Sequence, residues 1–357
     1  MAAKLFDGKR VLVTGGTGSL GKVLVRHLLN GKAGEPEKVV IFSRDEAKQH
    51  LMRMEYGNGK SVTEEVIYRN FQRKLQFWIG DVRDIDSVVS ALRDVDFVVN
   101  AAAMKQVPTC EYHPFEAVRT NIEGAENIVR AIQKHNLKVE TVVGVSTDKA
   151  CKPVNVMGMS KAIQERIFIQ GNMRCPGTRF ICTRYGNVLA SRGSVIPLFH
   201  DQIRNGGPVT ITTLEMTRFL LTLDDAVKTI FAALSEARPG ETYVPRAPSS
   251  RIVDVARALI GDRPIRIEVT GIRPGEKIHE ILVSEEEANR AVERGEWYAI
   301  PSMLPEVCGD SSGTGSMKKE YSSMDNVMDV EGTRALLKKH RLLVEDLPGQ
   351  LGGELLR

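Results

Sequence analysis

Short apolar runs alternate with stretches of helical periodicity through the first half of the chain. Six runs are rich in Val, Ile and Phe and mostly lack charge in their interiors: RVLVTGG, KVVIFSR, LQFWIGD, VDFVVNAAA, ETVVGVST and RFICTRYGNV. Such runs are typical of parallel strands that are buried on both faces. Between them lie helix-like stretches: LGKVLVRHLLNG, IDSVVSALRD, EGAENIVRAIQKH and MSKAIQERIFIQGN. The alternation predicts an α/β protein with a doubly wound parallel sheet of the Rossmann type.

The pattern changes after about residue 190 to shorter elements that are punctuated by Gly and Pro, such as SRGSVIPLFHDQI, GGPVTIT and GIRPGEKIHEILVS. We therefore predict a first domain over residues 1–190 and a smaller α/β lobe over 191–305, interleaved with the end of the main sheet. Residues 306–357 form a C-terminal loop and helix extension in this scheme. Residues 52–74 are predicted as a helix with a surface loop, and residues 309–319 as a mobile loop or linker.

The composition and charge of the chain mainly exclude classes of partner and site. The 357 residues are 42% hydrophobic, and 49 Lys and Arg against 45 Asp and Glu give a formal net charge of +4 without a long basic block. Nucleic acid is therefore not an indicated partner, although a basic pocket for an anionic ligand remains open. The five cysteines show no metal-binding spacing and indicate reduced thiols and no metal site. With no room for a signal peptide before the first strand and no long apolar run, we expect a cytoplasmic protein without a membrane span.

A glycine-rich segment, TGGTGSLG, follows the first predicted strand and opens the first predicted helix. In this context Gly15, Gly18 and Gly21 permit a tight turn, a close approach to a pyrophosphate and close helix packing, while the helix N-terminus favours negative charge. The segment therefore predicts a dinucleotide site. We expect Thr17, Ser19 and Leu20 to contribute to it as well.

The end of the second strand decides which dinucleotide is preferred. The sequence there is IFSRDE, so Ser43 and Arg44 occupy the place where an NAD site commonly has an acidic residue. A hydroxyl and a guanidinium suit a 2′-phosphate, so NADP is favoured and Asp45 keeps NAD as the second choice. Two further stretches of cofactor contact are expected: Asp81 and Val82 at the adenine, and Ala101, Ala102 and Ala103 along the nicotinamide half.

The motifs TGGTGSLG, NAAAMKQVP, TNIEGAENI, STDKA, MGMSK and RYGNVLASRGSVIP together resemble the extended short-chain dehydrogenases/reductases. Within that superfamily the chain is similar to the UDP-N-acetylglucosamine 4,6-dehydratases of bacterial capsule and flagellin-glycan synthesis, from the first strand to about residue 280. The resemblance implies that a bound NADP oxidises the sugar at carbon 4, that water is lost across carbons 5 and 6, and that the hydride returns to carbon 6. Further cofactor contacts that it implies are Lys105, Asn121, Ser146, Lys161, Tyr185, Asn187 and Val188.

The string STDKA supplies the candidate acid and base. Thr147, Asp148 and Lys149 follow a predicted strand, at the end of the sheet where ligands of this architecture bind. The resemblance implies that Asp148 protonates the departing hydroxyl of carbon 6 and that Lys149 removes the proton from carbon 5. A lysine base needs a depressed pKa, which burial near a cationic nicotinamide is expected to supply.

Lys161 matches the lysine of the superfamily's YxxxK pair, but Met157 stands where the tyrosine would be. A thioether cannot carry a proton, so the usual base for oxidation of the 4-hydroxyl is missing. One branch of the resembling dehydratases also has methionine there. We hypothesise that Asp148, directly or through Thr147 and a water, accepts the 4-hydroxyl proton. The alternative is that Met157 is plain apolar packing in an inactive site.

The expected substrate pocket is basic. By resemblance, its residues are Lys105, Asn187, Arg192, Ser194, Val195, Arg218, Arg273 and Glu276. Arginine suits phosphate by its forked geometry, which agrees with the UDP-sugar partner that the resemblance implies. A homo-oligomer, either a dimer or a hexamer, is expected because the helices after the fourth and fifth strands commonly form contacts in the superfamily.

Three other readings stay open. A UDP-sugar 4-epimerase would reduce the ketone from the other face without loss of water. A retaining 4,6-dehydratase would differ only in the configuration at carbon 5, for which inversion to the L-arabino product is the first choice. A regulator that senses NADP would bind the cofactor and ignore UDP-sugars.

Overall fold

The computed structural model describes residues 4–57, 73–189, 194–309, 315 and 317–346. Most of the predicted surface loop at 52–74 and most of the predicted linker at 309–319 lie outside these residues. The predicted substrate residue Arg192 also lies outside them.

The main sheet of the described residues has nine strands. In spatial order these are β14 (Val292–Arg294), β15 (Trp297–Ile300), β10 (Thr242–Pro245), β6 (Arg179–Tyr185), β5 (Thr141–Thr147), β4 (Phe97–Asn100), β1 (Arg10–Thr14), β2 (Lys38–Ser43) and β3 (Leu75–Ile79). The strands from β10 to β3 are parallel, and β15 and β14 continue the sheet antiparallel. The predicted doubly wound sheet is thus confirmed. Its order reverses between β1 and β4, so the crevice for a ligand lies beyond the carboxyl ends of these two strands.

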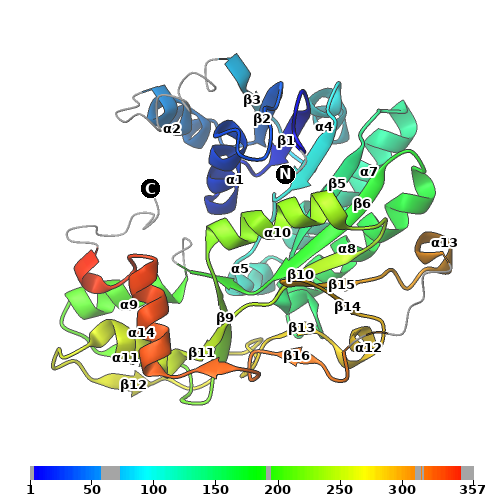
Figure 1. Ribbon diagram of the computed structural model, residues 1–357. Helices are drawn as coiled ribbons and strands as arrows, with labels where there is room; N and C mark the ends of the chain where they lie inside the picture. The colour runs from blue at the N-terminus through cyan, green and yellow to red at the C-terminus, as the bar shows by residue number, and fades with distance from the viewer. Residues whose placement is uncertain (1–3, 58–72, 190–193, 310–314, 316, 347–357) are drawn as a thin grey trace.

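Helices cover both faces of this sheet (Figure 1). One face carries α1 (Ser19–Leu29), α2 (Glu46–Gly57) and α10 (Leu223–Glu236), whose buried side chains include Leu24, Met52 and Ile230. The other face carries α4 (Ile85–Leu92), α7 (Gly124–His135) and α8 (Val156–Arg174). Short segments connect the layers: α5 (Val107–Tyr112), α6 (Pro114–Ala117), the π-helical turn η1 (Val118–Glu123) and the 3₁₀ turn η2 (Asp148–Ala150). The central strands β1, β2, β4 and β5 are mostly buried and apolar because both of their faces are covered.

A smaller lobe lies below the main sheet in Figure 1. Its four-stranded sheet has the order β17 (Val327–Met328), β11 (Ser249–Arg251), β9 (Thr217–Leu221) and β7 (Asn187–Val188). Two strand pairs accompany it, namely β12 (Ile267–Val269) with β8 (Val209–Ile211), and β13 (Ile281–Val283) with β16 (Tyr321–Ser322). Its helices are α9 (Val195–Arg204), α11 (Ile252–Ile260) and α14 (Val330–Lys339), with the short α12 (Glu285–Ala288) and η3 (Val344–Asp346). The short α13 (Pro305–Cys308) instead lies against α8. Phe199, Leu259 and Leu337 belong to its separate apolar core.

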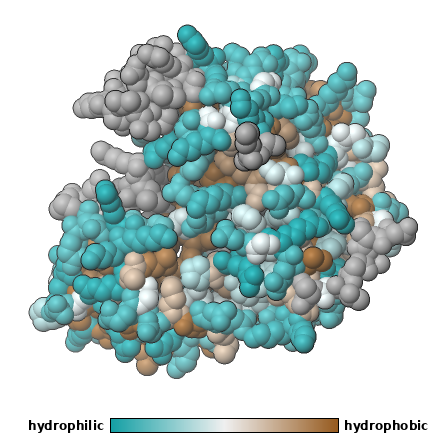
Figure 2. Space-filling model, in the orientation of Figure 1, coloured by the Kyte–Doolittle hydropathy of each residue, from teal (hydrophilic) through white to brown (hydrophobic). Residues whose placement is uncertain are grey.

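The chain passes between the two parts several times. Strands β10, β14 and β15 belong to the main sheet although they follow residue 190, whereas β16 and β17 bring the C-terminal extension into the lobe. Figure 2 shows a mostly hydrophilic face, with hydrophobic atoms visible between its upper and lower parts. Within the described part of the chain, no helix is long and apolar enough to cross a membrane.

Candidate active site

The glycine-rich turn after β1 lies against the segment that follows β4. Gly15 has φ +65°, and a Cβ there would lie 2.9 Å from the Cα of Ala102. A Cβ at Gly21 would lie 2.5 Å from the Cα of Gly16, so the first turn of α1 packs on the loop only with glycine. The amide of Ala102 donates to Thr14 Oγ1 at 3.1 Å and fixes this approach. The arrangement fits a dinucleotide whose pyrophosphate meets the N-terminus of α1, at Ser19 and Leu20.

The carboxyl end of β2 presents a hydroxyl and a cation. Ser43 Oγ lies 3.1 Å from Thr17 Oγ1, and the Arg44 side chain is 59% exposed with its Nη1 3.6 Å from Asp81 Oδ2. Asp45 instead serves the start of α2, because its Oδ1 accepts from Lys48 N at 3.0 Å and its Oδ2 from Lys48 Nζ at 2.5 Å. The Asp45 carboxylate is therefore occupied locally, and a contact of Ser43 and Arg44 with a phosphate or ribose stays a prediction.

Asn121 fixes the loop that follows the alanines after β4. Its Oδ1 accepts from Met104 N at 2.8 Å, and its Nδ2 donates to Met104 O at 3.0 Å and to Ser160 Oγ at 2.8 Å. The side chain is fully buried in the π-helical turn η1. Both ends of its amide are used within the protein, so Asn121 holds Met104 and α8 in register; a contact with the cofactor stays a prediction.

The predicted acid lies at the carboxyl end of β5 and is completely buried. Asp148 Oδ1 accepts from Thr147 Oγ1 at 2.8 Å and from Lys149 Nζ at 3.0 Å, while Oδ2 has no hydrogen-bond partner among the described residues. Gly186 makes room for this carboxylate, since a Cβ there would lie 3.3 Å from Asp148 Oδ2 and 2.6 Å from Phe219 Cβ. A buried carboxylate oxygen without a partner is costly and is characteristic of sites prepared for a ligand.

Lys149 lies between two carboxylates. Its Nζ is 3.0 Å from Asp148 Oδ1, 3.2 Å from Glu280 Oε1 and 3.2 Å from the Oδ1 of Asn187. Desolvation by itself lowers the pKa of Lys149, but the attraction of Asp148 and Glu280 outweighs it and the pKa is raised. The depressed pKa expected from the sequence is therefore wrong for the protein's own groups, because the sequence did not reveal Glu280.

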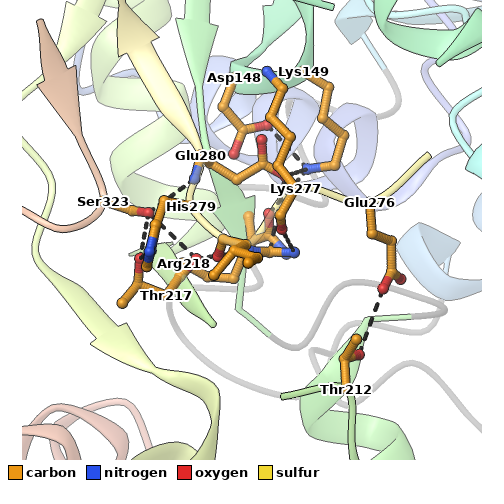
Figure 3. Close-up of polar contacts among 12 residues, drawn as sticks. Asp148, Lys149, Thr212, Thr217, Arg218, Glu276, Lys277, His279, Glu280 and Ser323 are labelled. Atoms are coloured by element: carbon orange, nitrogen blue, oxygen red, sulfur yellow. Dashed lines mark hydrogen bonds and ion pairs between the residues drawn. The ribbon is translucent and has the colours of Figure 1, made fainter. Parts of the chain in front are cut away.

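Arg218 is buried and binds the segment before β13. Its Nη1 donates to Thr217 O at 2.7 Å and to Ile278 O at 3.0 Å, and its Nη2 donates to Lys277 O at 2.9 Å. Its Nε lies 3.8 Å from Glu280 Oε1. Figure 3 shows Arg218 below Glu280 and Lys149, with three of its donors directed at backbone and carboxylate. Arg218 thus shapes the candidate pocket, and a direct contact with a diphosphate stays a prediction.

Lys161 and Met157 occupy successive turns of α8 and are both buried. Lys161 Nζ donates to Val145 O at 2.8 Å and to Gln164 Oε1 at 2.9 Å. Desolvation lowers its pKa to about 8. Met157 packs with Cys110 and Ala117 in a small apolar cluster, so no proton-carrying group replaces the tyrosine at this position.

The other predicted residues are placed as follows. Ser146 donates to Glu165 Oε1 at 2.5 Å, and burial raises the pKa of Tyr185 in the core. Glu276 Oε2 lies 3.5 Å from Thr212 Oγ1, while Arg273 and Lys105 are exposed. The remaining predicted residues lie at or next to the ends of helices and strands. Gly18 precedes α1, Ser194 precedes Val195 at the start of α9, and Asn187 and Val188 form β7. Val82 follows β3, and Ala101 and Ala103 follow β4. Among the described residues, no group of three His, Cys, Asp or Glu side chains is arranged to hold a metal ion.

The sequence alone did not identify Glu280, Thr217, His279 and Ser323. Glu280 is 2% exposed, and its amide donates to Ser323 Oγ at 2.9 Å. Ser323 in turn lies 2.7 Å from Thr217 Oγ1, which is 2.8 Å from His279 Nδ1 (Figure 3). The one sequence signal was a charged pair, His279 and Glu280, directly before the apolar run of β13. Ser323 carried no signal because its neighbours in the site are more than 40 residues away.

The fold and the site define a Rossmann-type α/β protein of the extended short-chain dehydrogenase/reductase class, with a dinucleotide cradle and an acid/base cluster at the carboxyl ends of its strands. The chain matches the model of the polysaccharide biosynthesis protein family over residues 11–302 and belongs to that family.

Known proteins resemble the chain over most of its length. A UDP-glucose 4-epimerase of Rickettsia conorii is 46% identical over 302 residues, which cover 83% of this chain and 84% of that protein. The crystal structure of Pen from Bacillus thuringiensis is 35% identical with a TM-score of 0.82, and covers 95% of this chain and 99% of that one. A dTDP-glucose 4,6-dehydratase of Streptomyces venezuelae, solved with NAD, is 23% identical with a TM-score of 0.63 over 75% of this chain and 86% of its own, and shares the fold.

Proposed function

We propose that the protein is a nucleotide-sugar 4,6-dehydratase that converts UDP-N-acetylglucosamine to a UDP-2-acetamido-2,6-dideoxy-4-keto-hexose, with inversion at carbon 5. The observation that carries this proposal is the buried cluster of Asp148, Lys149 and Glu280 at the carboxyl end of β5. Loss of water across carbons 5 and 6 requires both an acid and a base beside the sugar, and this cluster contains both. The family membership and the sequence motifs agree with a nucleotide-sugar substrate.

The cofactor that fits the cradle is a nicotinamide dinucleotide, which supplies reversible hydride removal from carbon 4 when it is bound. Gly15 and Gly21 leave room for its pyrophosphate, and Ser43 and Arg44 favour NADP. The occupation of Asp45 by Lys48 strengthens this preference, since a free carboxylate at that place would favour the ribose hydroxyls of NAD. The Streptomyces dehydratase of the same fold carries NAD, so NAD remains the second choice.

Asp148 is the group best placed to exchange protons with the sugar hydroxyls. Its Oδ1 is already saturated by Thr147 and Lys149, so its Oδ2 is the oxygen left for the substrate. Acceptance of the 4-hydroxyl proton would take over the task of the missing tyrosine, and donation to the 6-hydroxyl would help that group to leave. The thioether of Met157 supports this assignment because it carries no proton, and burial raises the pKa of the neighbouring Cys110 thiol.

Lys149 is the proposed base for carbon 5. Oxidation at carbon 4 acidifies that proton, and the Lys149 side chain, 22% exposed, has access to the pocket while its Nζ contacts both carboxylates. Arg273 and Lys105, both exposed, are the proposed partners of the UDP group, with Glu276 and Asn187 beside them. Their charges would balance the diphosphate.

A UDP-sugar 4-epimerase is the second candidate, and the names of the Rickettsia relatives favour it. Such an enzyme shares the cradle and the hydride chemistry. It has no need of an acid/base pair at carbons 5 and 6, which is why the cluster around Lys149 favours dehydration.

Incubation with UDP-N-acetylglucosamine in deuterated water, followed by NMR, tests the proposal. We expect a 4-keto product with deuterium at carbon 5, and its ring coupling constants report inversion or retention. Asp148→Asn should lower turnover roughly 100-fold or more, because it removes the proton carrier.

Each other outcome has a definite meaning. A 4-epimeric sugar without deuterium at carbon 5 would identify the epimerase. Near-normal turnover by Asp148→Asn would assign the 4-hydroxyl proton to another group. Bound NADP with unchanged sugar, for UDP-glucose as well, would point to the sensing role.

A further inference from the structure

Glu280 places a second buried carboxylate at the amine of the proposed base. Its Oε1 lies 3.2 Å from Lys149 Nζ, and the residue is 2% exposed. Its Oε2 is buried without a hydrogen-bond partner among the described residues, as is Asp148 Oδ2. Two carboxylates thus flank one ammonium group, and each keeps one oxygen unsatisfied (Figure 3).

The charges around this cluster come from three parts of the chain. Asp148 and Lys149 belong to η2, Arg218 to β9, and Lys277 and His279 to the segment that ends at Glu280. Lys277 Nζ donates to Cys151 O at 2.6 Å and is thereby drawn away from the carboxylates. The Nη1 and Nη2 atoms of Arg218 donate to backbone oxygens, and its Nε lies 3.8 Å from Glu280 Oε1. Lys149 is therefore the cation in closest contact with Glu280.

This arrangement poses a chemical problem that the proposed function has to solve. A base must begin its step without a proton, yet the contact with two carboxylates keeps Lys149 in its ammonium form. Asp148 cannot take up the surplus proton without losing its own task, because it exchanges protons with the sugar hydroxyls. Glu280 has no such task, and its carboxylate contacts the same amine from a different segment of the chain.

We propose that Glu280 is a positioning residue that acts through Lys149 as its proton acceptor, a role that rests on the proposed dehydratase function. The Lys149 ammonium transfers one proton to the Glu280 carboxylate, which leaves a neutral amine and a neutral carboxylic acid. The amine then accepts the carbon-5 proton, and the electron pair of that bond moves into the enolate of the 4-ketone. The enolate expels the 6-hydroxyl, which leaves as water with the proton that Asp148 took from the 4-hydroxyl. Return of the proton from Glu280 to the solvent or the product restores the starting state, so charge and protons balance.

The backbone around Glu280 is fixed in a way that suits this role. Its amide donates to Ser323 Oγ at 2.9 Å, and Thr217 N donates to Ile278 O at 3.1 Å just before it. Strand β13 begins at the next residue and pairs with β16. The carboxylate is therefore held against Lys149 from outside the Rossmann sheet, which makes the lobe a part of the acid/base chemistry.

The test uses the full-length protein and UDP-N-acetylglucosamine, and compares Glu280→Gln, Glu280→Asp and wild type. We expect Glu280→Gln to lower kcat and the uptake of deuterium at carbon 5 roughly 100-fold, with little change in KM. The first step, removal of hydride from carbon 4 as followed by the absorbance of reduced nicotinamide, should persist. The loss of kcat on acidification should weaken in this variant, and Glu280→Asp should recover part of the rate. Glu285→Gln, an exposed change close by with a 73% exposed side chain, serves as the control.

The outcomes separate the two proposals. Suppose that wild type forms the 4-keto product and that Glu280→Gln has the same rate, deuterium uptake and pH profile as wild type. This result overturns the role of Glu280 and leaves the dehydratase function standing. If both Glu280 variants lose hydride removal as well as product formation, Glu280 has only a structural role, and the inference is overturned. Wild-type protein that forms no 4-keto product overturns the dehydratase function and this inference with it.

Discussion

Individual buried charges show how the residue scale sets the chemistry. Lys161 is 5% exposed and is bound to a backbone oxygen and to Gln164, without a carboxylate in contact with its amine. Lys149 is paired with two carboxylates, and its pKa moves the other way. Two lysines of one active-site region thus differ because desolvation acts on both, whereas opposite charge acts strongly on one.

Lys161 leads to a prediction about pH. Its pKa falls from 10.5 to about 8 on folding, so the unfolded chain binds more protons between these values and stability rises with pH across them. Its burial therefore costs about 3 kcal/mol below about pH 8, and this cost disappears towards pH 10.5. The free energy of unfolding of Lys161→Met minus that of wild type should decrease from about pH 7 to about pH 10, as measured by urea unfolding. A difference that is constant with pH would contradict the depressed pKa.

At the scale of elements, a buried network joins the Rossmann sheet to the lobe directly behind the candidate site. Arg184 of β6 binds Glu165 of α8 and Glu287 of α12, with shortest distances of 2.7 Å, and donates to Leu282 O of β13 at 2.9 Å. Glu287 also completes the capping box of α12 with Ser284. Since β13 follows Glu280 directly, this network helps to hold that residue near Lys149.

We expect Arg184→Met to destabilise the protein by about 3–5 kcal/mol, because two carboxylates are left buried without a cation. Desolvation would raise the pKa of Glu287, but Arg184 lowers it from 4.5 to about 2, so this stabilisation is present above pH 4.5 and is lost as the pH falls towards 2. The difference from wild type should therefore shrink in acid. Arg266→Met, which removes an exposed pair with Glu268, is the control and should change little. Thermal unfolding at several pH values measures both, and an equal small effect of the two changes would speak against the network.

At the scale of the whole molecule, the candidate site assembles segments from the full length of the chain. Asp148 follows β5, Thr217 begins β9, Glu280 precedes β13, and Ser323 lies at the end of β16. The C-terminal extension therefore does more than cover the lobe, because the Ser323 hydroxyl bonds to both Thr217 and Glu280. The hydrogen bonds around Glu280 thus include a residue beyond the region that matches the family model.

Ser323→Ala tests this dependence. We expect a loss of about 1–3 kcal/mol in stability from the unpaired Glu280 amide, and a lower kcat with little change in KM because Glu280 is less well held against Lys149. Ser302→Ala is a matched control, since Ser302 is also buried and its Oγ accepts from Leu304 N at 3.0 Å. It should lower stability in a similar way and leave kcat unchanged. If Ser323→Ala and Ser302→Ala changed kcat to the same extent, Ser323 would have no specific role in the proposed active site.

Much of the fold could be predicted because it follows from local patterns. The six apolar runs became parallel strands, and the helical stretches between them became the two covering layers, since burial on both faces demands uninterrupted apolar strands. The cradle was equally local, as Gly15 and Gly21 show by the space that a Cβ would fill. Asp148 and Lys149 could be singled out because they are adjacent in the chain and follow a strand.

Neighbours in the chain therefore specified the doubly wound sheet, which the structure confirms, and they predicted the phosphate cradle and the adjacent pair Asp148 and Lys149. Only the tertiary structure brought Glu280 to Lys149, turned Arg218 inward and inserted Ser323 from the C-terminal extension. It also reversed the expected shift in the pKa of Lys149. A pKa depends on the charges near a group and on its desolvation. The residues that supply both come from distant segments of the chain, and the sequence does not state which of these segments meet in space.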